Sequence, residues 1–125
     1  MTVRDHCRVV GYVAQALLGA FPHVCVPGIT TLAALHDIGK ITPGFQVKCP
    51  AWIDQNGLRG KATHEAWSLR VSDHARVSQA TLQNLLGDER LLPWAAIVGA
   101  HHGKLKGARL RLREPWEDER IQLAQ

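Results

Sequence analysis

The apolar residues of this 125-residue chain recur mostly at intervals of three and four, which predicts a succession of amphipathic helices. The first helix is expected from about Arg4 to Gly19, and His6 lies one turn before Val10 on its apolar stripe. His6 is therefore predicted to point inward. The other expected members of the stripe are Val13, Ala14, Leu17, Leu18 and Phe21.

A second helix is predicted from about Thr30 to Ile38, and its alanine and leucine content indicates burial on most sides. It delivers the adjacent pair His36 and Asp37 into the interior, with Lys40 one turn beyond the pair. An imidazole beside a carboxylate offers one nitrogen and two oxygens, which are donors that Mn, Fe, Co, Ni and Zn ions accept. A single His-Asp pair is also typical of an ordinary helix end, so the metal interpretation depends on further histidines.

The remaining pattern is helical as well. Thr42 and Pro43 are typical of a helix start, and Thr63 is expected to cap a third main helix that begins at His64. A further helix is predicted from about Asp73 to Leu86, and a last polar helix from Glu117 to Leu123. Because no convincing pair of strands occurs, the sequence predicts an all-α fold.

Paired histidines, His101 and His102, end an apolar helix that opens at Pro93. Neighbouring residues on a helix diverge by about 100°, so the two rings are expected to face opposite sides of a metal centre, or two metals. For one of the two, a solvated helix end is a reasonable alternative. His74 lies at the polar start of its helix and is assigned no chemistry.

A short basic run follows the paired histidines. Its tail alternates charged and apolar residues, which places the arginines on one face of an extended segment, where they can follow a phosphate backbone. A solvated edge with no ligand has the same pattern, and the two interpretations carry equal weight. The candidate nucleic-acid-binding residues are Lys104, Lys106, Arg109 and Arg111.

The composition of the chain limits the number of domains, the kind of partner and the possible cysteine sites. With 46% hydrophobic residues, the chain suffices for one domain with a core, 1–125, and its net charge of +4 permits an anionic partner. Three cysteines without C-x-x-C spacing, Cys7, Cys25 and Cys49, favour neither a disulfide framework nor a thiolate zinc site. No transmembrane run or signal peptide is recognised, so a soluble cytoplasmic protein is expected.

The ordered histidines resemble those of the HD superfamily of metal-dependent phosphohydrolases. More narrowly, two stretches are similar to the HD nuclease domain of the CRISPR-associated helicase-nuclease of type I systems. The first is Ala34-Leu35-His36-Asp37-Ile38-Gly39-Lys40 with Phe45-Gln46 shortly after, and the second is Gly99-Ala100-His101-His102-Gly103 after Pro93-Trp94. The resemblance runs from about His6 to Gly103 and implies an all-α HD-domain helical bundle with a central metal site. It also implies a nuclease acting on single-stranded DNA, with a helicase domain in cis or trans and a CRISPR RNA-guided surveillance complex as partners.

The resemblance also assigns roles. Asp37 would bridge two metals, and Lys40 would neutralise charge on the phosphate during hydrolysis. Six nitrogen and oxygen ligands without thiolate favour Mn, Fe, Co or Ni, and Mg is also compatible. The ligands implied are His6 and His36 for one ion and His64, His101 and His102 for the other, with Asp37 shared.

The chain departs from that family in two ways. It contains no helicase part, and it is expected to be shortened at its C-terminus, because the family usually supplies a further aspartate from a later helix. Glu117 and Asp118 are the candidates to replace that aspartate. Two other functions stay open: a phosphohydrolase acting on a small nucleotide, and a non-catalytic interaction domain in which the histidines are structural.

Overall fold

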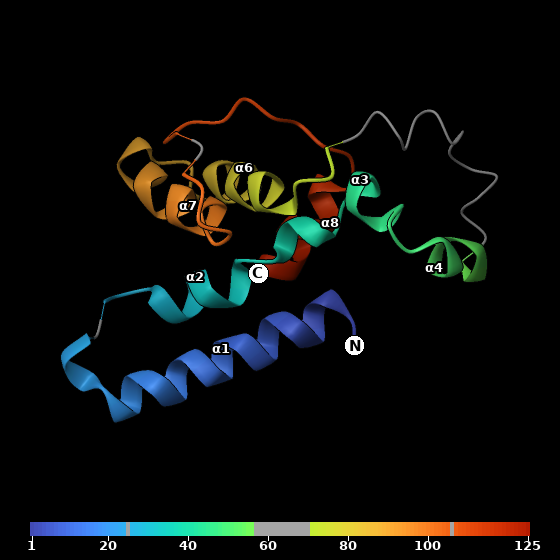
Figure 1. The fold of residues 1–125 in the computed structure, drawn as a ribbon. Helices are drawn as coiled ribbons and strands as arrows, with labels where there is room; N and C mark the ends of the chain where they lie inside the picture. Colours follow the sequence, from blue (N-terminus) through green and yellow to red (C-terminus); the bar gives the residue numbers. More distant parts are fainter. Residues whose placement is uncertain (25, 57–70, 106) are drawn as a thin grey trace.

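A computed structural model describes residues 1–24, 26–56, 71–105 and 107–125. These residues contain α-helices and short 3-10 helices and no strand, which confirms the all-α prediction (Figure 1). The predicted helix that begins at His64 lies outside the described residues. The α-helices are α1 (Val3–Ala20), α2 (Ile29–Leu35), α3 (Pro43–Gln46), α4 (Pro50–Gln55), α6 (His74–Leu86), α7 (Leu92–Gly99) and α8 (Glu117–Ala124), and the 3-10 helices are η1 (Pro22–Val24), η2 (Ile38–Lys40) and η3 (Glu89–Leu91).

Helix α1 begins with a capping box. The backbone N–H of Asp5 donates to the Thr2 hydroxyl at 3.1 Å, and the backbone N–H of Thr2 donates to the Asp5 carboxylate at 3.2 Å. Two N–H groups that a helix start leaves unpaired are satisfied in this way. The cap fixes the first turn of α1, from which His6 reaches the interior.

The apolar stripe predicted for α1 is buried only in part. Val10, Ala14 and Leu18 are half-buried, whereas Val13 and Leu17 are more than half exposed. The prediction of a fully inward stripe was wrong because α1 packs mainly against α2, a much shorter helix, which covers only one side of it (Figure 1).

Helix α6 forms the centre of the fold. Every residue from 77 to 83 is buried, which includes polar positions as well as apolar ones. Leu82 joins a core cluster with Leu35 and Ile38 from the turn around Asp37, and with Ala95 and Val98 of α7. Full burial of one such leucine is worth about 1.5–3 kcal/mol. Asp73 caps the start of α6, and Gly87, in the left-handed region, ends it as predicted.

Two buried glutamines of α6 hold the segment that follows α7. The Gln83 amide donates to the Ala108 carbonyl at 2.5 Å and accepts from the Leu110 N–H at 3.1 Å, and Gln79 donates to the Gly107 carbonyl at 2.7 Å. These contacts satisfy backbone groups that have no helix or strand partner. The segment therefore runs extended over α6 without being a strand.

The C-terminal helix α8 is anchored by Arg120, a residue that is 1% exposed. Its guanidinium donates to the Thr81 hydroxyl at 2.8 Å and to the Ile41 carbonyl at 2.8 Å. It also donates to the carbonyls of Pro115 and Glu114, at 2.6 and 3.0 Å. One buried cation thus connects α8 to α6 and to the end of η2, directly beyond Lys40.

Candidate metal centre

Asp37 lies between the end of α2 and the start of η2, and its side chain is 6% exposed. Its chain position follows from the early end of α2 at Leu35, three residues before the predicted end. Because Asp37 has left the regular helix, its two oxygens face different parts of the interior. Four other segments of the protein approach them.

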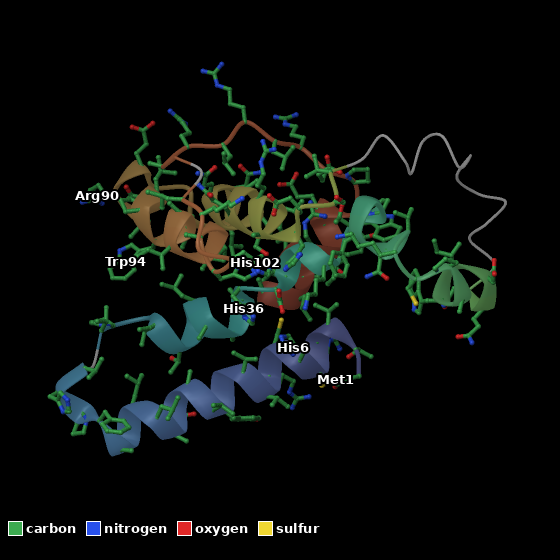
Figure 2. All side chains as sticks on the ribbon, in the orientation of Figure 1. Met1, His6, His36, Arg90, Trp94 and His102 are labelled. Atoms are coloured by element: carbon green, nitrogen blue, oxygen red, sulfur yellow. The ribbon has the colours of Figure 1, made fainter. Side chains whose placement is uncertain are left out.

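The first oxygen, Oδ2, faces α1 and η2. His6 Nε2 lies 2.8 Å from it, His36 Nε2 3.1 Å, and the Lys40 ammonium donates a hydrogen bond to it at 2.7 Å. The ring of His6 comes from α1 and that of His36 from the end of α2, with 5.4 Å between the ring centroids (Figure 2). His6 thus points inward, as the sequence predicted.

The second oxygen, Oδ1, faces α6 and the residues after α7. His74 Nε2 lies 3.0 Å from Oδ1 and His101 Nε2 lies 3.6 Å from it. His74 is the first residue of α6, and the packing of α6 against η2 carries its ring to Asp37. The carboxylate is therefore shared between two histidine groups.

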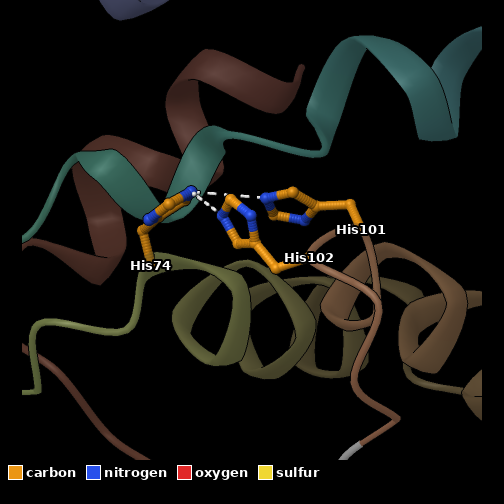
Figure 3. A group of neighbouring side chains, drawn as sticks. All are labelled: His74, His101 and His102. Carbon is orange, nitrogen blue, oxygen red and sulfur yellow. Dashed lines mark hydrogen bonds between the residues drawn. The ribbon is translucent and has the colours of Figure 1, made fainter.

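The rings of His74, His101 and His102 form the second of these groups (Figure 3). His74 Nε2 lies 3.3 Å from His101 Nε2 and 3.0 Å from His102 Nε2. The prediction that His101 and His102 face opposite sides was wrong, since their ring centroids are only 4.2 Å apart. Helix α7 ends at Gly99, so the helical angle of 100° between neighbours does not apply to them.

Backbone contacts fix which ring nitrogen is available. His36 Nδ1 lies 2.7 Å from the Ala33 carbonyl, and His101 Nδ1 lies 2.7 Å from the Val98 carbonyl. A carbonyl oxygen can only accept, so each Nδ1 carries the hydrogen and each Nε2 presents a lone pair toward Asp37. Histidine ligands of metals are commonly oriented by such a bond from the other ring nitrogen.

His6 Nε2 supplies an independent test of whether a cation fits. The atom is buried and has no hydrogen-bond partner among the described residues, although Asp37 Oδ2 is within 2.8 Å. The two atoms are close but not aligned as donor and acceptor. A buried polar nitrogen without a partner is costly, and a cation between the imidazole and the carboxylate would satisfy both. The residues present therefore fit a metal.

The protonation states agree with this fit. The pKa of His74 is lowered to about 4, chiefly by burial and also by His101 and His102, while Asp37 opposes the shift. Burial also lowers the pKa of His101. Both rings are therefore neutral near pH 7, which is the form that binds metals.

Asp37 and the Cys7 thiol differ in their charge near pH 7. Burial alone would raise the pKa of Asp37, but the hydrogen bond from Lys40, together with the charge of that ammonium, helps to hold it below its ordinary value. Burial raises the pKa of the Cys7 thiol, and the charge of Asp37 raises it further. Asp37 is thus an anion, whereas Cys7 stays a thiol and is no competing thiolate ligand.

Two sets of donors among the described residues are arranged for a divalent ion. Within each set the ligand atoms lie within 4.8 Å of one another. Imidazole nitrogens and carboxylate oxygens without thiolate are the donors that first-row transition metals accept. The sets are His6, His36 and Asp37, and His74, His101 and His102.

Five of the six metal ligands predicted from sequence, Asp37 and four histidines, therefore belong to the two donor sets, and the sixth, His64, lies outside the described residues. His74 was missed because a histidine directly after the cap of a helix is normally solvated. The available signal was its spacing of four residues from Ser78, which places both on one face of α6. The candidate replacement Glu117 instead accepts from the Asn84 amide, and Asp118 is exposed.

Of the predicted nucleic-acid-binding residues, one follows the metal centre closely in the chain and the others lie farther along it. Lys104 follows His102 by two residues and is exposed, whereas Lys106 lies outside the described residues. The extended segment over α6 runs on the side away from α1 (Figure 1). Arg109 and Arg111 of this segment are exposed, and Arg109 pairs with Glu89 at 3.0 Å.

Comparison with known proteins identifies the family of the chain. A sequence model of the family described as Cas3, HD domain, matches residues 3–125. The chain belongs to the Cas3 HD-domain family. It is also similar to the CRISPR-associated nuclease/helicase Cas3 of Streptococcus thermophilus, with 31% identity over 85 residues that cover 58% of this chain and 9% of the relative. No solved structure matches the chain significantly.

Membership makes this a Cas3-type HD domain, and HD domains of this family are metal-dependent hydrolases of the nuclease class. The chain spans about 9% of the length of the Streptococcus thermophilus relative. Among the described helices, none is long and apolar enough to cross a membrane.

Proposed function

We propose that this HD domain is a metal-dependent nuclease that hydrolyses phosphodiester bonds of single-stranded DNA in type I CRISPR interference. The observation that carries the proposal is the position of Asp37, whose two oxygens face two separate sets of histidines. A carboxylate shared in this way is suited to bridge two cations. Two bridged cations are the usual arrangement for phosphodiester hydrolysis.

The ligand sets define what the chain contributes. His6, His36 and Oδ2 of Asp37 would hold one ion, and His74, His101, His102 and Oδ1 would hold the other. When bound, divalent ions such as Mn, Fe, Co or Ni, or Mg, supply Lewis acidity toward a phosphate oxygen and activate water. The buried carbonyl contacts of His36 and His101 keep the rings in place, so binding costs little reorganisation.

Lys40 is the residue proposed to bind the phosphate. Its ammonium lies against Asp37, and its side chain is 30% exposed, so it stands between the buried carboxylate and solvent. A cation at that position would stabilise the negative charge that grows on the non-bridging phosphate oxygens. Without metal, the same ammonium compensates the charge of Asp37.

The strand itself is proposed to approach from the exposed side of His102. Lys104 is best placed to contact its phosphates, because it follows His102 by two residues, and Arg109 and Arg111 would extend the contact over α6. The relative is a nuclease/helicase, which supports a helicase domain in cis or trans as a partner. A CRISPR RNA-guided surveillance complex would recruit both to DNA.

The test is cleavage by the chain loaded with Mn²⁺, Co²⁺ or Ni²⁺ in turn. Circular single-stranded DNA should be cut, EDTA should stop the reaction, and mononucleotides should stay intact. Asp37→Asn should abolish cutting, whereas Asp118→Asn, the same change at an exposed aspartate of α8, should not. Turnover of mononucleotides with intact circular DNA would instead identify a small-nucleotide phosphohydrolase, and a protein that binds no metal would be an interaction domain.

A further inference from the structure

A groove outside the metal centre is lined by two tryptophans. Trp52 comes from α4 and Trp116 from the residue before α8, and the start of α1 forms the third wall. Figure 1 shows α4, α8 and the N-terminus around one side of the molecule. The groove has a volume of about 860 Å³, within the range of roughly 300–1,000 Å³ that is typical of ligand sites.

We infer that this groove is a base-stacking subsite for the single strand that the metal centre cuts, with Trp52 and Trp116 as the stacking side chains. The inference rests on the proposed nuclease function and adds residues to it. Indole rings stack on bases of any sequence, which suits binding of single-stranded nucleic acid without sequence preference. Trp52 is 37% exposed, so much of its surface is available.

Three residues that line the groove neighbour residues of the metal centre, two of them along the chain and one through a hydrogen bond. Arg4 precedes the candidate ligand His6 by two residues on α1. Ile41 directly follows Lys40, and the Gln46 amide donates to the Lys40 carbonyl at 2.8 Å. A strand whose phosphate reaches Lys40 would therefore have its neighbouring nucleotides at the mouth of the groove.

The charges along the groove favour bases inside it and phosphates at its edge. Exposed Arg4 offers a cation to the backbone beside the centre, whereas Glu119 lines the groove near α8 and repels phosphate. The remaining lining is mostly apolar, with Val3, Ile41 and Leu123 among its residues. Stacked bases satisfy such a lining better than a sugar-phosphate backbone does.

Trp116 also has an unusual backbone. With a φ of 63°, it is the one residue other than glycine that has a positive φ in the described part of the chain. This conformation is unfavourable for a bulky side chain, and asparagine or glycine adopts it at lower cost. Trp116→Asn therefore removes the ring while relieving the backbone, which makes it a suitable test variant.

The experiment measures binding without cleavage. Fluorescein-labelled dT12 is titrated with the full 125-residue chain in EDTA, and anisotropy gives the Kd. Trp52→Leu and Trp116→Asn should each weaken binding about tenfold, the loss expected for one stacked base. Trp52→Phe should stay within about threefold of wild type, because it keeps an aromatic face.

Trp94→Leu is the matched control. Trp94 lies on α7, at the opposite side of the molecule from Met1, which lines the groove (Figure 2). The Kd of the Trp94→Leu variant for dT12 should equal that of the wild type. Circular dichroism should show that every variant is folded. Equal Kd values for wild type, Trp52→Leu and Trp116→Asn would overturn the inference and leave the groove to a protein segment.

A second measurement separates this inference from the nuclease proposal. The metal-loaded chain is given bis(p-nitrophenyl) phosphate, a small diester that reaches the metal centre without filling the groove. Trp52→Leu should hydrolyse it at the wild-type rate and show a raised KM only for single-stranded DNA. If the wild type hydrolyses neither substrate while tryptophan-dependent dT12 binding persists, the nuclease proposal fails and the stacking groove stands.

Discussion

Gly39 and Ser78 are joined by a buried hydrogen bond, in which the Gly39 N–H donates to the Ser78 hydroxyl at 2.9 Å. The backbones are so close that a Cβ on Gly39 would lie 2.0 Å from the His74 carbonyl oxygen. Glycine is therefore required at this position by packing. This contact ties the turn that carries Asp37 to the helix that carries His74, and so sets the distance between the two ligand groups.

Ser78→Ala is expected to leave the buried Gly39 N–H without an acceptor. The free energy of unfolding should fall by about 1–3 kcal/mol, the cost of one unsatisfied buried donor. Urea unfolding followed by circular dichroism measures this change. Ser72→Ala, at an exposed serine before α6, should change the value by about 0.5 kcal/mol or less. Equal values for the two variants would contradict a structural role for the Gly39–Ser78 bond.

His74→Ala tests the ligand that the sequence pattern did not reveal. Loss of the ring should lower the affinity for one metal ion at least about tenfold, because even residues that only orient ligands are worth this much. Isothermal titration with Mn²⁺ or Co²⁺ measures the affinity and the stoichiometry. His23→Ala, at an exposed histidine of η1, provides the control and should bind as the wild type does. Unchanged binding by the His74 variant would remove it from the centre.

Local signals in the sequence were sufficient for much of the fold. Asp73 and Gly87 marked the ends of α6 because a side-chain cap and a left-handed glycine act within one turn of the chain. The cluster around Asp37 was also predictable, since an inward histidine needs a partner and several such histidines were present.

What the sequence did not reveal depends on packing between distant segments. His74 reaches Asp37 only because α6 lies tightly against η2, and no local pattern encodes that approach. The shared direction of His101 and His102 follows from the end of α7 two residues earlier, a boundary that periodicity locates poorly. The exposed side of α1 reflects the shortness of α2, which is a property of its neighbour.

Lys40→Ala should separate phosphate binding from metal binding. The kcat/KM for single-stranded DNA is expected to fall about 10²–10³-fold, the usual cost of one charge-stabilising donor. Metal content should be retained, because removing the ammonium leaves Asp37 Oδ2 free for the cation. Lys48→Ala is the control, since its ammonium lies 4.8 Å from the centroid of the Phe45 ring instead of against Asp37. Metal loss in the Lys40 variant would contradict the assignment.

Metal removal should lower the melting temperature of the chain. A ligand bound only by the native state stabilises it by about 2.7 kcal/mol at a concentration of 100 times its Kd. EDTA is therefore expected to shift the calorimetric transition of metal-loaded protein downward by several degrees. Asp37→Asn should show little response to either metal or EDTA. A wild-type transition that is the same with and without the chelator would argue against a bound ion.

Arg120→Met should be the most destabilising of these changes. It removes the donor from three backbone carbonyls and the Thr81 hydroxyl, and each buried group left unpaired costs about 1–3 kcal/mol. The free energy of unfolding should therefore fall by about 3 kcal/mol or more. Arg111→Met, at an exposed arginine, should change it by about 0.5 kcal/mol or less. Urea titration of both variants decides between these outcomes.

The residues around Asp37 come from positions 6 to 102, which makes the centre a late event in folding. Loops of many residues must close before His6 and His101 can approach the same carboxylate, and each closure costs conformational entropy. In the unfolded chain the same histidines are separated and solvated. Metal ions should accordingly slow unfolding more than they accelerate folding, so that the loaded chain stays folded for longer.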